Sequence, residues 1–147
     1  MIYLNLSRPD LSFTIQHLSQ FSSQPRLPHL QTAYHVVKFL KGSIDAGLFY
    51  PSSSEVKLLA YSDSDYNNCK FNRRLVSGYS IFLGHSLISW KTKKQPTVSK
   101  SSTEAEYRSM SYTTSEMVWL YNLLQDLHLS IPLPIRLCCD NKSAEYL

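Results

Sequence analysis

The 147-residue sequence predicts a mixed α+β fold, in which a helical hairpin precedes three antiparallel strands, a long helix and a parallel fourth strand. Three observations support this prediction. Short apolar runs with short separations recur between residues 56 and 90, a segment with helical spacing of apolar residues spans about 101–127, and another apolar run follows at 135–139. A strand that follows a helical crossover normally pairs in parallel with the strand it joins, so the last run is expected to lie parallel to the first.

Residues 1–50 are expected to form the hairpin of two short amphipathic helices. Ser7 is a candidate cap for the first helix, Pro9 suits its first turn, and apolar side chains continue at helical spacing to residue 21. The second helix is predicted between residues 30 and 40, with Gly42 as its stop. The lysines and arginine of this hairpin are interpreted as a solvated face.

A change of pattern near residues 50–55 predicts a domain boundary, with a second domain at 55–147. Residues 47–50 are a candidate short strand. The proline and three serines at 51–54 are typical of a linker. Beyond the linker, short strands alternate with turns, and a lysine-rich polar stretch then leads into the long helix. The expected strands are residues 56–61, 78–83, 87–90 and 135–139, the polar stretch is 91–100, and the helix is about 101–127.

The first and fourth predicted strands both run into an aspartate, Asp63 and Asp140. If these strands are neighbours, the two carboxylates lie side by side at one edge of the sheet, and the helix can bring a third acid over them. Clustered carboxylates raise one another's pKa unless a cation lies between them, so the arrangement predicts a site for Mg²⁺ or Mn²⁺.

The start of the helix offers two candidates for the third acid, Glu104 and Glu106, which cannot face the same way because they are two residues apart. If Ser101 is the N-cap, Glu104 completes a capping box and Glu106 is left for the site. Thr103 and Glu106 form a second possible box with the roles reversed. Helix chemistry alone leaves both assignments open.

Composition narrows the class of protein only modestly. The formal net charge of +4 and the isoelectric point of about 9.0 are compatible with a polyanionic partner. Three cysteines without a C-x-x-C spacing and five scattered histidines indicate neither a disulfide framework nor a zinc site. The sequence contains no apolar run of membrane-spanning length, so we expect an intracellular protein with no membrane partner.

Five motifs, in order, resemble the ribonuclease H region of copia-type retrotransposon polyproteins. They are YSDSDY at 61–66, RRLVSGY at 73–79, ISWKTKKQ at 88–95, SKSSTEAEY at 99–107 and CDNKSA at 139–144. Upstream, RPDLSF at 8–13 and FLKG at 39–42 resemble the segment that joins this region to the reverse transcriptase in the same polyproteins. The resemblance covers nearly the whole chain.

The resemblance implies a ribonuclease H-like fold and cleavage of the RNA strand of an RNA–DNA hybrid with two Mg²⁺ or Mn²⁺ ions. It assigns the catalytic, metal-binding positions to Asp63, Glu106 and Asp140, while Glu104 and Asp65 match positions that are not metal ligands. In a two-metal mechanism, Asp63 is expected to bridge both ions, and Glu106 and Asp140 each to hold one. The expected partners are the hybrid and the reverse transcriptase portion of the same polyprotein.

Substrate binding is expected to be largely independent of sequence, with basic side chains neutralising phosphates. The weaker candidates for this role are Arg73, Arg74, Lys91, Lys93, Lys94 and Lys100. A solvated rim around the sheet is the alternative interpretation for each of them.

The chain departs from the family where it stops, at Leu147. The family carries a fourth acid with a nearby histidine further downstream, so the sequence suggests a C-terminally truncated domain with a helix beginning at 143–147. The alternative function is therefore an inactive retroelement remnant or a non-catalytic nucleic-acid-binding module. For an intact element, the resemblance implies a cytoplasmic, virus-like particle location or a nuclear one.

Overall fold

The computed structural model describes residues 2–65, 76–95 and 98–140. The chain divides into two compact units, residues 1–49 and residues 50–147, and each has a hydrophobic cluster of its own. Arg73, Arg74 and the helix expected at 143–147 lie outside the described residues. No helix within the described ranges is both long and apolar enough to cross a bilayer.

The first unit is a helical hairpin, as predicted. Leu11 and Ile15 from its first half pack with Val36 from its second, and these three side chains are buried together. Burial of one apolar side chain from each helix fixes the two amphipathic faces against each other. The elements are the 3₁₀ helices η1 (Ile2–Leu6) and η2 (Pro9–Leu11), followed by the helices α1 (Ser12–Ser19) and α2 (Leu27–Gly42).

Arg8, rather than Ser7, organises the start of this unit. Its buried guanidinium donates to both carboxylate oxygens of Asp10, at 3.0 and 2.8 Å, and to the carbonyl and hydroxyl of Ser43, at 3.0 and 2.9 Å. The expectation that Ser7 caps a helix was wrong, because the chain first makes the short turn η2, which has no side-chain cap. Helix α1 then begins at Ser12.

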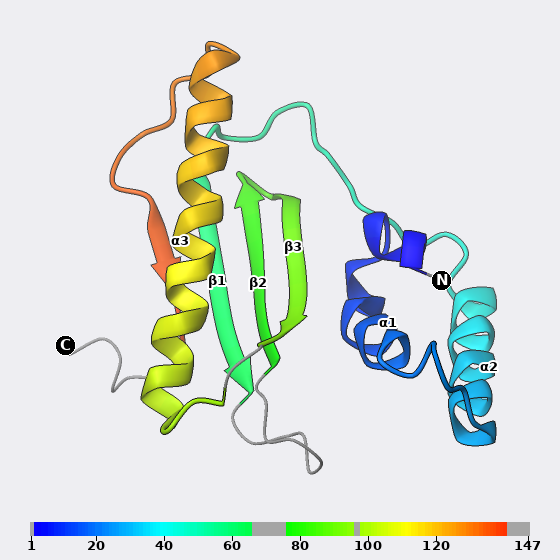
Figure 1. Ribbon diagram of the computed structural model, residues 1–147. Helices are drawn as coiled ribbons and strands as arrows, with labels where there is room; N and C mark the ends of the chain where they lie inside the picture. The colour runs from blue at the N-terminus through cyan, green and yellow to red at the C-terminus, as the bar shows by residue number, and fades with distance from the viewer. Residues whose placement is uncertain (1, 66–75, 96–97, 141–147) are drawn as a thin grey trace. The chain divides into compact units, whose positions relative to one another are not determined.

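The second unit contains a four-stranded mixed sheet in the order β3-β2-β1-β4 (Figure 1). Strands β1, β2 and β3 are antiparallel, and β4 pairs in parallel with β1 after the helix α3. The predicted fold class, α+β with three antiparallel strands, a helix and a parallel strand, is thus confirmed at this level. The elements are β1 (Leu58–Asp65), β2 (Val76–Leu83), β3 (Ser86–Lys94), α3 (Ser102–Asp126) and β4 (Arg136–Cys138).

Three details of the predicted strands were wrong. Strand β1 does not stop before Asp63 but continues through it, because each residue from Leu58 to Asp65 pairs with a residue of β2. Strand β3 likewise extends into the lysine-rich stretch, since its pairing with β2 reaches Lys94. Residues 47–50 form no strand and have no ladder partner among the described residues.

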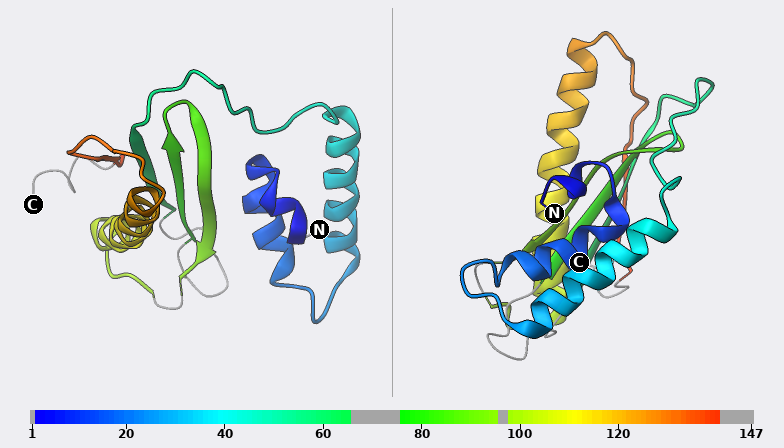
Figure 2. Two further views of the ribbon diagram at one scale, coloured as in Figure 1. Left: turned by 90° about the horizontal axis from the view of Figure 1, so that it is seen from above. Right: turned by 90° about the vertical axis from the view of Figure 1, so that its right-hand side faces the viewer.

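Helix α3 lies along one face of the sheet, mainly over β1 and secondarily over β2 (Figure 2). Its apolar half supplies Met117, Leu120 and Leu124 to the core, where they meet Leu58, Ala60, Ile81 and Ile131. The N-terminal half of the same buried face is polar. This half faces the part of the sheet where Asp63 lies, so the packing positions the functional side chains described next.

Candidate metal centre

Asp63 lies on β1, and Asp140 lies two residues beyond the end of the neighbouring strand β4. The parallel pairing of β1 and β4 places Tyr61 opposite Cys138, and each aspartate follows two residues later. Because side chains alternate along a strand with a period of two, Asp63 projects from the same side of β1 as Tyr61, and Asp140 follows the end of β4. Neighbouring strands are about 4.8 Å apart, so the two carboxylates are close.

Helix α3 supplies the third carboxylate from Glu106. The buried residues of the helix recur at spacings of three and four, which defines a single face that includes Glu106, Ser109 and Thr113. Glu106 itself is only 4% exposed. The helical period therefore directs Glu106 toward the sheet.

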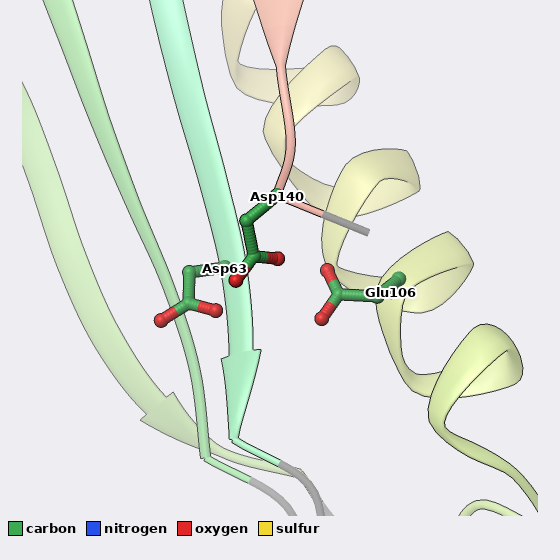
Figure 3. A group of neighbouring side chains, drawn as sticks. All are labelled: Asp63, Glu106 and Asp140. Carbon is green, nitrogen blue, oxygen red and sulfur yellow. The ribbon is translucent and has the colours of Figure 1, made fainter. Parts of the chain in front are cut away.

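The three predicted carboxylates converge. Ligand oxygens of Asp63, Glu106 and Asp140 all lie within 4.8 Å of one another (Figure 3). Asp63 and Asp140 are exposed while Glu106 is buried, so the group opens to solvent on one side and is closed by the helix on the other. The structure brings together residues that lie 43 and 34 positions apart in the sequence, counting from 63 to 106 and from 106 to 140.

The surroundings of Glu106 disfavour its charged form. Burial and, after it, the nearby charges of Asp140 and Asp63 raise its pKa to about 7, while a backbone hydrogen bond from Ser64 opposes the rise. Its Oε2 atom is buried and has no hydrogen-bond partner among the described residues. An unpartnered, desolvated oxygen beside two further carboxylates is a position where a cation lowers the free energy.

Glu104 is engaged at the helix start instead. Its backbone amide donates to the Ser101 hydroxyl at 3.1 Å, its Oε2 accepts from the Lys100 amide at 2.8 Å, and its Oε1 pairs with Arg108 at 2.9 Å. The Lys100 amide and then Arg108 lower the pKa of Glu104. This is the first of the two capping arrangements that the sequence allows, except that the reciprocal bond goes to Lys100 rather than to Ser101.

Buried hydroxyl groups fix α3 against β1 beside the carboxylates. Ser62 donates to the Ser109 hydroxyl at 2.8 Å, and Ser109 donates to the backbone carbonyl of Asp63 at 2.9 Å. Thr113, one turn further along α3, donates to the Ser109 carbonyl at 2.8 Å. Since Ser109 lies one turn after Glu106, these bonds tie the strand at Asp63 to the helix turn that carries Glu106.

The geometry and chemistry of the group fit a hard divalent cation. Carboxylate oxygens are the ligands that Mg²⁺ and Mn²⁺ prefer. One oxygen of each carboxylate lies within 4.8 Å of the others, so all three residues can face a shared cation. The residues present therefore suit such an ion.

Comparison with known proteins places the chain among transposon sequences. It is 42% identical to the retrovirus-related Pol polyprotein from transposon RE1 and 41% identical to that from transposon RE2, both of Arabidopsis thaliana, each over 99% of this chain and 10% of the relative. It is also 40% identical to the secreted RxLR effector protein 161 of Plasmopara viticola, over 82% of this chain and 84% of that protein. Over nearly its whole length, the chain is thus similar to one part of retrovirus-related Pol polyproteins from plant transposons.

The similarity to the Pol polyproteins concerns one part of them. The chain spans about a tenth of the length of the RE1 and RE2 polyproteins. No family model matches the chain, and no solved structure matches it.

The structure also locates four of the six basic residues that the sequence predicts as substrate contacts. Lys91 and Lys93 are exposed on β3, Lys94 ends that strand and is partly buried, and Lys100 is exposed just before α3. Arg73 and Arg74 are outside the described residues. None of the four lysines contributes to the carboxylate group itself.

Tyr112 is a residue of interest that the sequence did not indicate. It lies on α3, where its ring is 5.7 Å from the Lys91 ammonium and 5.1 Å from the Lys93 ammonium. Nothing local in the sequence signals this contact, because β3 and α3 meet only through the packing of the helix on the sheet. Ser109 was missed for the same reason.

Proposed function

We propose that the second unit of this chain is the ribonuclease H region of a retrotransposon Pol polyprotein, which cleaves the RNA strand of RNA–DNA hybrids. The observation that carries the proposal is the convergence of Asp63, Glu106 and Asp140 to within 4.8 Å on a mixed sheet. A buried carboxylate with an unpartnered oxygen in that group supports metal-dependent chemistry rather than a merely structural cluster.

In this proposal, the three carboxylates hold two Mg²⁺ or Mn²⁺ ions. Bound divalent ions supply a water of lowered pKa and neutralise charge on the leaving oxygen. The chain's own residues fix the geometry: Asp63 is held on a paired strand, Asp140 follows the neighbouring strand, and Glu106 is aimed from a helix that is hydrogen-bonded to β1. Exposed Asp63 and Asp140 leave the scissile phosphate an open approach, while the buried side of Glu106 restricts water.

We also propose that the first unit is the segment that links this region to the reverse transcriptase in such polyproteins. The similarity to the RE1 polyprotein extends over 99% of the chain and so includes that unit. The expected partners are therefore the hybrid and the polymerase portion of the polyprotein.

The direct test is cleavage of a labelled RNA–DNA hybrid by the purified 147-residue chain in Mg²⁺. The proposal predicts cleavage of the RNA strand, absent from RNA–RNA and DNA–DNA duplexes and lost in EDTA. Asp63→Asn, Glu106→Gln and Asp140→Asn should each reduce the rate at least a hundredfold, because each removes a ligand charge. Glu104→Gln is the matched control and should retain activity.

Two outcomes contradict the proposal. One is cleavage that survives Asp63→Asn, since that activity would not depend on the carboxylate group. The other is no cleavage of the hybrid by a sample whose circular dichroism and cooperative unfolding show that it is folded.

A further inference from the structure

The two serines that flank Asp63 on β1 face helix α3, whereas Asp63 itself faces the other side of the sheet. Successive side chains of a strand alternate between its two faces, and burial along β1 follows this alternation. The buried residues are Leu58, Ala60, Ser62 and Ser64, and the exposed ones are Tyr61 and Asp63. Ser62 bonds to Ser109 of α3, which identifies the buried side as the side that α3 covers. Ser64 therefore points into the space between β1 and α3.

Ser64 lies at the level of Glu106. Helix α3 runs antiparallel to β1, because its C-terminal half packs on Leu58 while Ser109, nearer its start, bonds to Ser62. From that bond, Ser64 is two residues further along the strand, a distance of about 6.7 Å. Glu106 is three residues back along the helix, a rise of about 4.5 Å in the same direction. The hydroxyl of Ser64 and the carboxylate of Glu106 are thus brought to the same part of the interface.

The contact between these two side chains is buried. Ser64 is 8% exposed and Glu106 is 4% exposed. Against the burial and the neighbouring carboxylates that raise the pKa of Glu106, the backbone and the hydroxyl of Ser64 both act to lower it, so both groups are near the carboxylate. Ser64 Oγ and Glu106 Oε2 nevertheless have no hydrogen-bond partner in the part of the chain that the structure describes. Buried polar atoms are rarely left without a partner in proteins, so these two indicate a site that is completed by a ligand.

Glu106 needs support more than the two aspartates do. Its carboxylate is carried on a longer side chain, while Asp63 has a short side chain on a strand that is paired with β2. Glu106 extends from α3 toward Asp63 and Asp140, which lie on and beyond neighbouring strands (Figure 3). Groups that hydrogen-bond a ligating carboxylate from outside fix its orientation and strengthen metal binding.

We propose that Ser64 is a positioning residue for Glu106, and that its hydroxyl donates to the Glu106 carboxylate and holds it in the orientation that ligates the divalent cation. This inference rests on the proposed function, because the cation site is the same one. With one carboxylate oxygen on the cation and the other on the Ser64 hydroxyl, both unpartnered atoms are satisfied. Strand β1 then serves the site from both faces, through Asp63 on one and Ser64 on the other.

The test combines Mn²⁺ titration, followed by electron paramagnetic resonance, with urea unfolding in EDTA. Ser64→Ala should weaken Mn²⁺ binding about tenfold, as loss of an outer partner of a metal ligand typically does. It should not lower the free energy of unfolding in EDTA, since the hydroxyl that is removed has no partner there. Ser64→Thr keeps the hydroxyl and should bind Mn²⁺ nearly as the parent chain does. A serine with a merely structural role would show the reverse: lost stability and unchanged Mn²⁺ affinity.

Ser99→Ala is the matched control. Ser99 also has a buried hydroxyl without a partner among the described residues, but it lies before the start of α3. This variant should bind Mn²⁺ as the parent chain does. In the cleavage assay, Ser64→Ala should lower kcat at limiting Mn²⁺ with little change in the KM for the hybrid, and excess Mn²⁺ should restore kcat.

Three results overturn the inference. They are equal Mn²⁺ affinity in the parent chain and a folded Ser64→Ala variant, an equal loss of affinity in Ser99→Ala, and a folded Ser64→Thr variant that binds Mn²⁺ no better than Ser64→Ala. Failure of the proposed function is a different result, because the parent chain would then bind Mn²⁺ no better than Asp63→Asn.

Discussion

Glu106 carries a carboxylate where charge is unfavourable in the absence of a cation. Because its pKa in the folded protein, about 7, lies above the ordinary glutamate value, the folded state binds more protons than the unfolded state between those two values. The contribution of Glu106 to the free energy of unfolding is therefore fully present below about pH 4.5. It is lost as the pH rises through 7. The pKa of Glu104 is lowered instead, so its stabilising contribution is lost as the pH falls through the acid range.

We therefore predict that the metal-free chain loses stability between pH 4.5 and 7 in a way that Glu106→Gln abolishes. The difference in free energy of unfolding between the parent and the variant should change by roughly 1–3 kcal/mol across this pH range. One pKa unit corresponds to about 1.4 kcal/mol, and solvent screening reduces the effect. Urea unfolding in EDTA at several pH values measures it. Parallel pH profiles for the parent and the variant would contradict this view of Glu106.

Ser109 is the second residue with a specific role, because it links Ser62 to the carbonyl of Asp63. Ser109→Ala should destabilise the second unit by about 1–3 kcal/mol, since it leaves the buried Ser62 hydroxyl without its acceptor. Ser111→Ala, an exposed serine on the same helix, should change stability by less than about 0.5 kcal/mol. Equal effects of the two substitutions on urea unfolding would show that the buried hydroxyl bonds contribute nothing.

At the scale of elements, the start of α3 decides which glutamate enters the site. The Ser101 hydroxyl accepts from the Glu104 amide, and the Glu104 side chain turns back to the Lys100 amide. Glu106 is thereby left on the buried face. The sequence contained both capping arrangements, and only the packing of α3 on β1 distinguishes them.

Ser101→Ala should lower the free energy of unfolding by about 0.5–2 kcal/mol, because a helix amide loses its cap. Ser102→Ala, one residue later and inside the helix, should have no destabilising effect, since alanine is the better helix former. The comparison by urea unfolding isolates the cap from the loss of a serine. A larger loss for Ser102→Ala would place the helix start elsewhere.

Strand positions were readable from the sequence, whereas strand ends were not. Apolar runs marked β1 through β4, but Asp63 and the lysines of β3 were expected outside the strands. Pairing with β2 extends both strands into these polar segments, because backbone hydrogen bonds there do not depend on apolar side chains. Residues 47–50 resemble a strand in sequence but pair with no strand in the part of the chain that the structure describes.

At the scale of the whole molecule, the order of elements was enough to predict that three distant carboxylates meet. Parallel pairing of β1 with β4 brings Asp140 beside Asp63, and the crossover helix packs on β1 and brings Glu106 to them. The contact of Tyr112 with the lysines of β3 could not be predicted in this way. It depends on the lateral position of α3 over β1 and β2, which the alternation of apolar and polar residues does not specify.

The central claim is that Asp63, Glu106 and Asp140 act together as one divalent cation site. Mn²⁺ titration followed by electron paramagnetic resonance at pH 8, where Glu106 is ionised, tests it most directly. The account predicts that Asp63→Asn, Glu106→Gln and Asp140→Asn each weaken Mn²⁺ binding at least tenfold and that Glu104→Gln leaves it unchanged. Unchanged Mn²⁺ affinity in any one of the first three variants, or its loss in Glu104→Gln, would contradict the account.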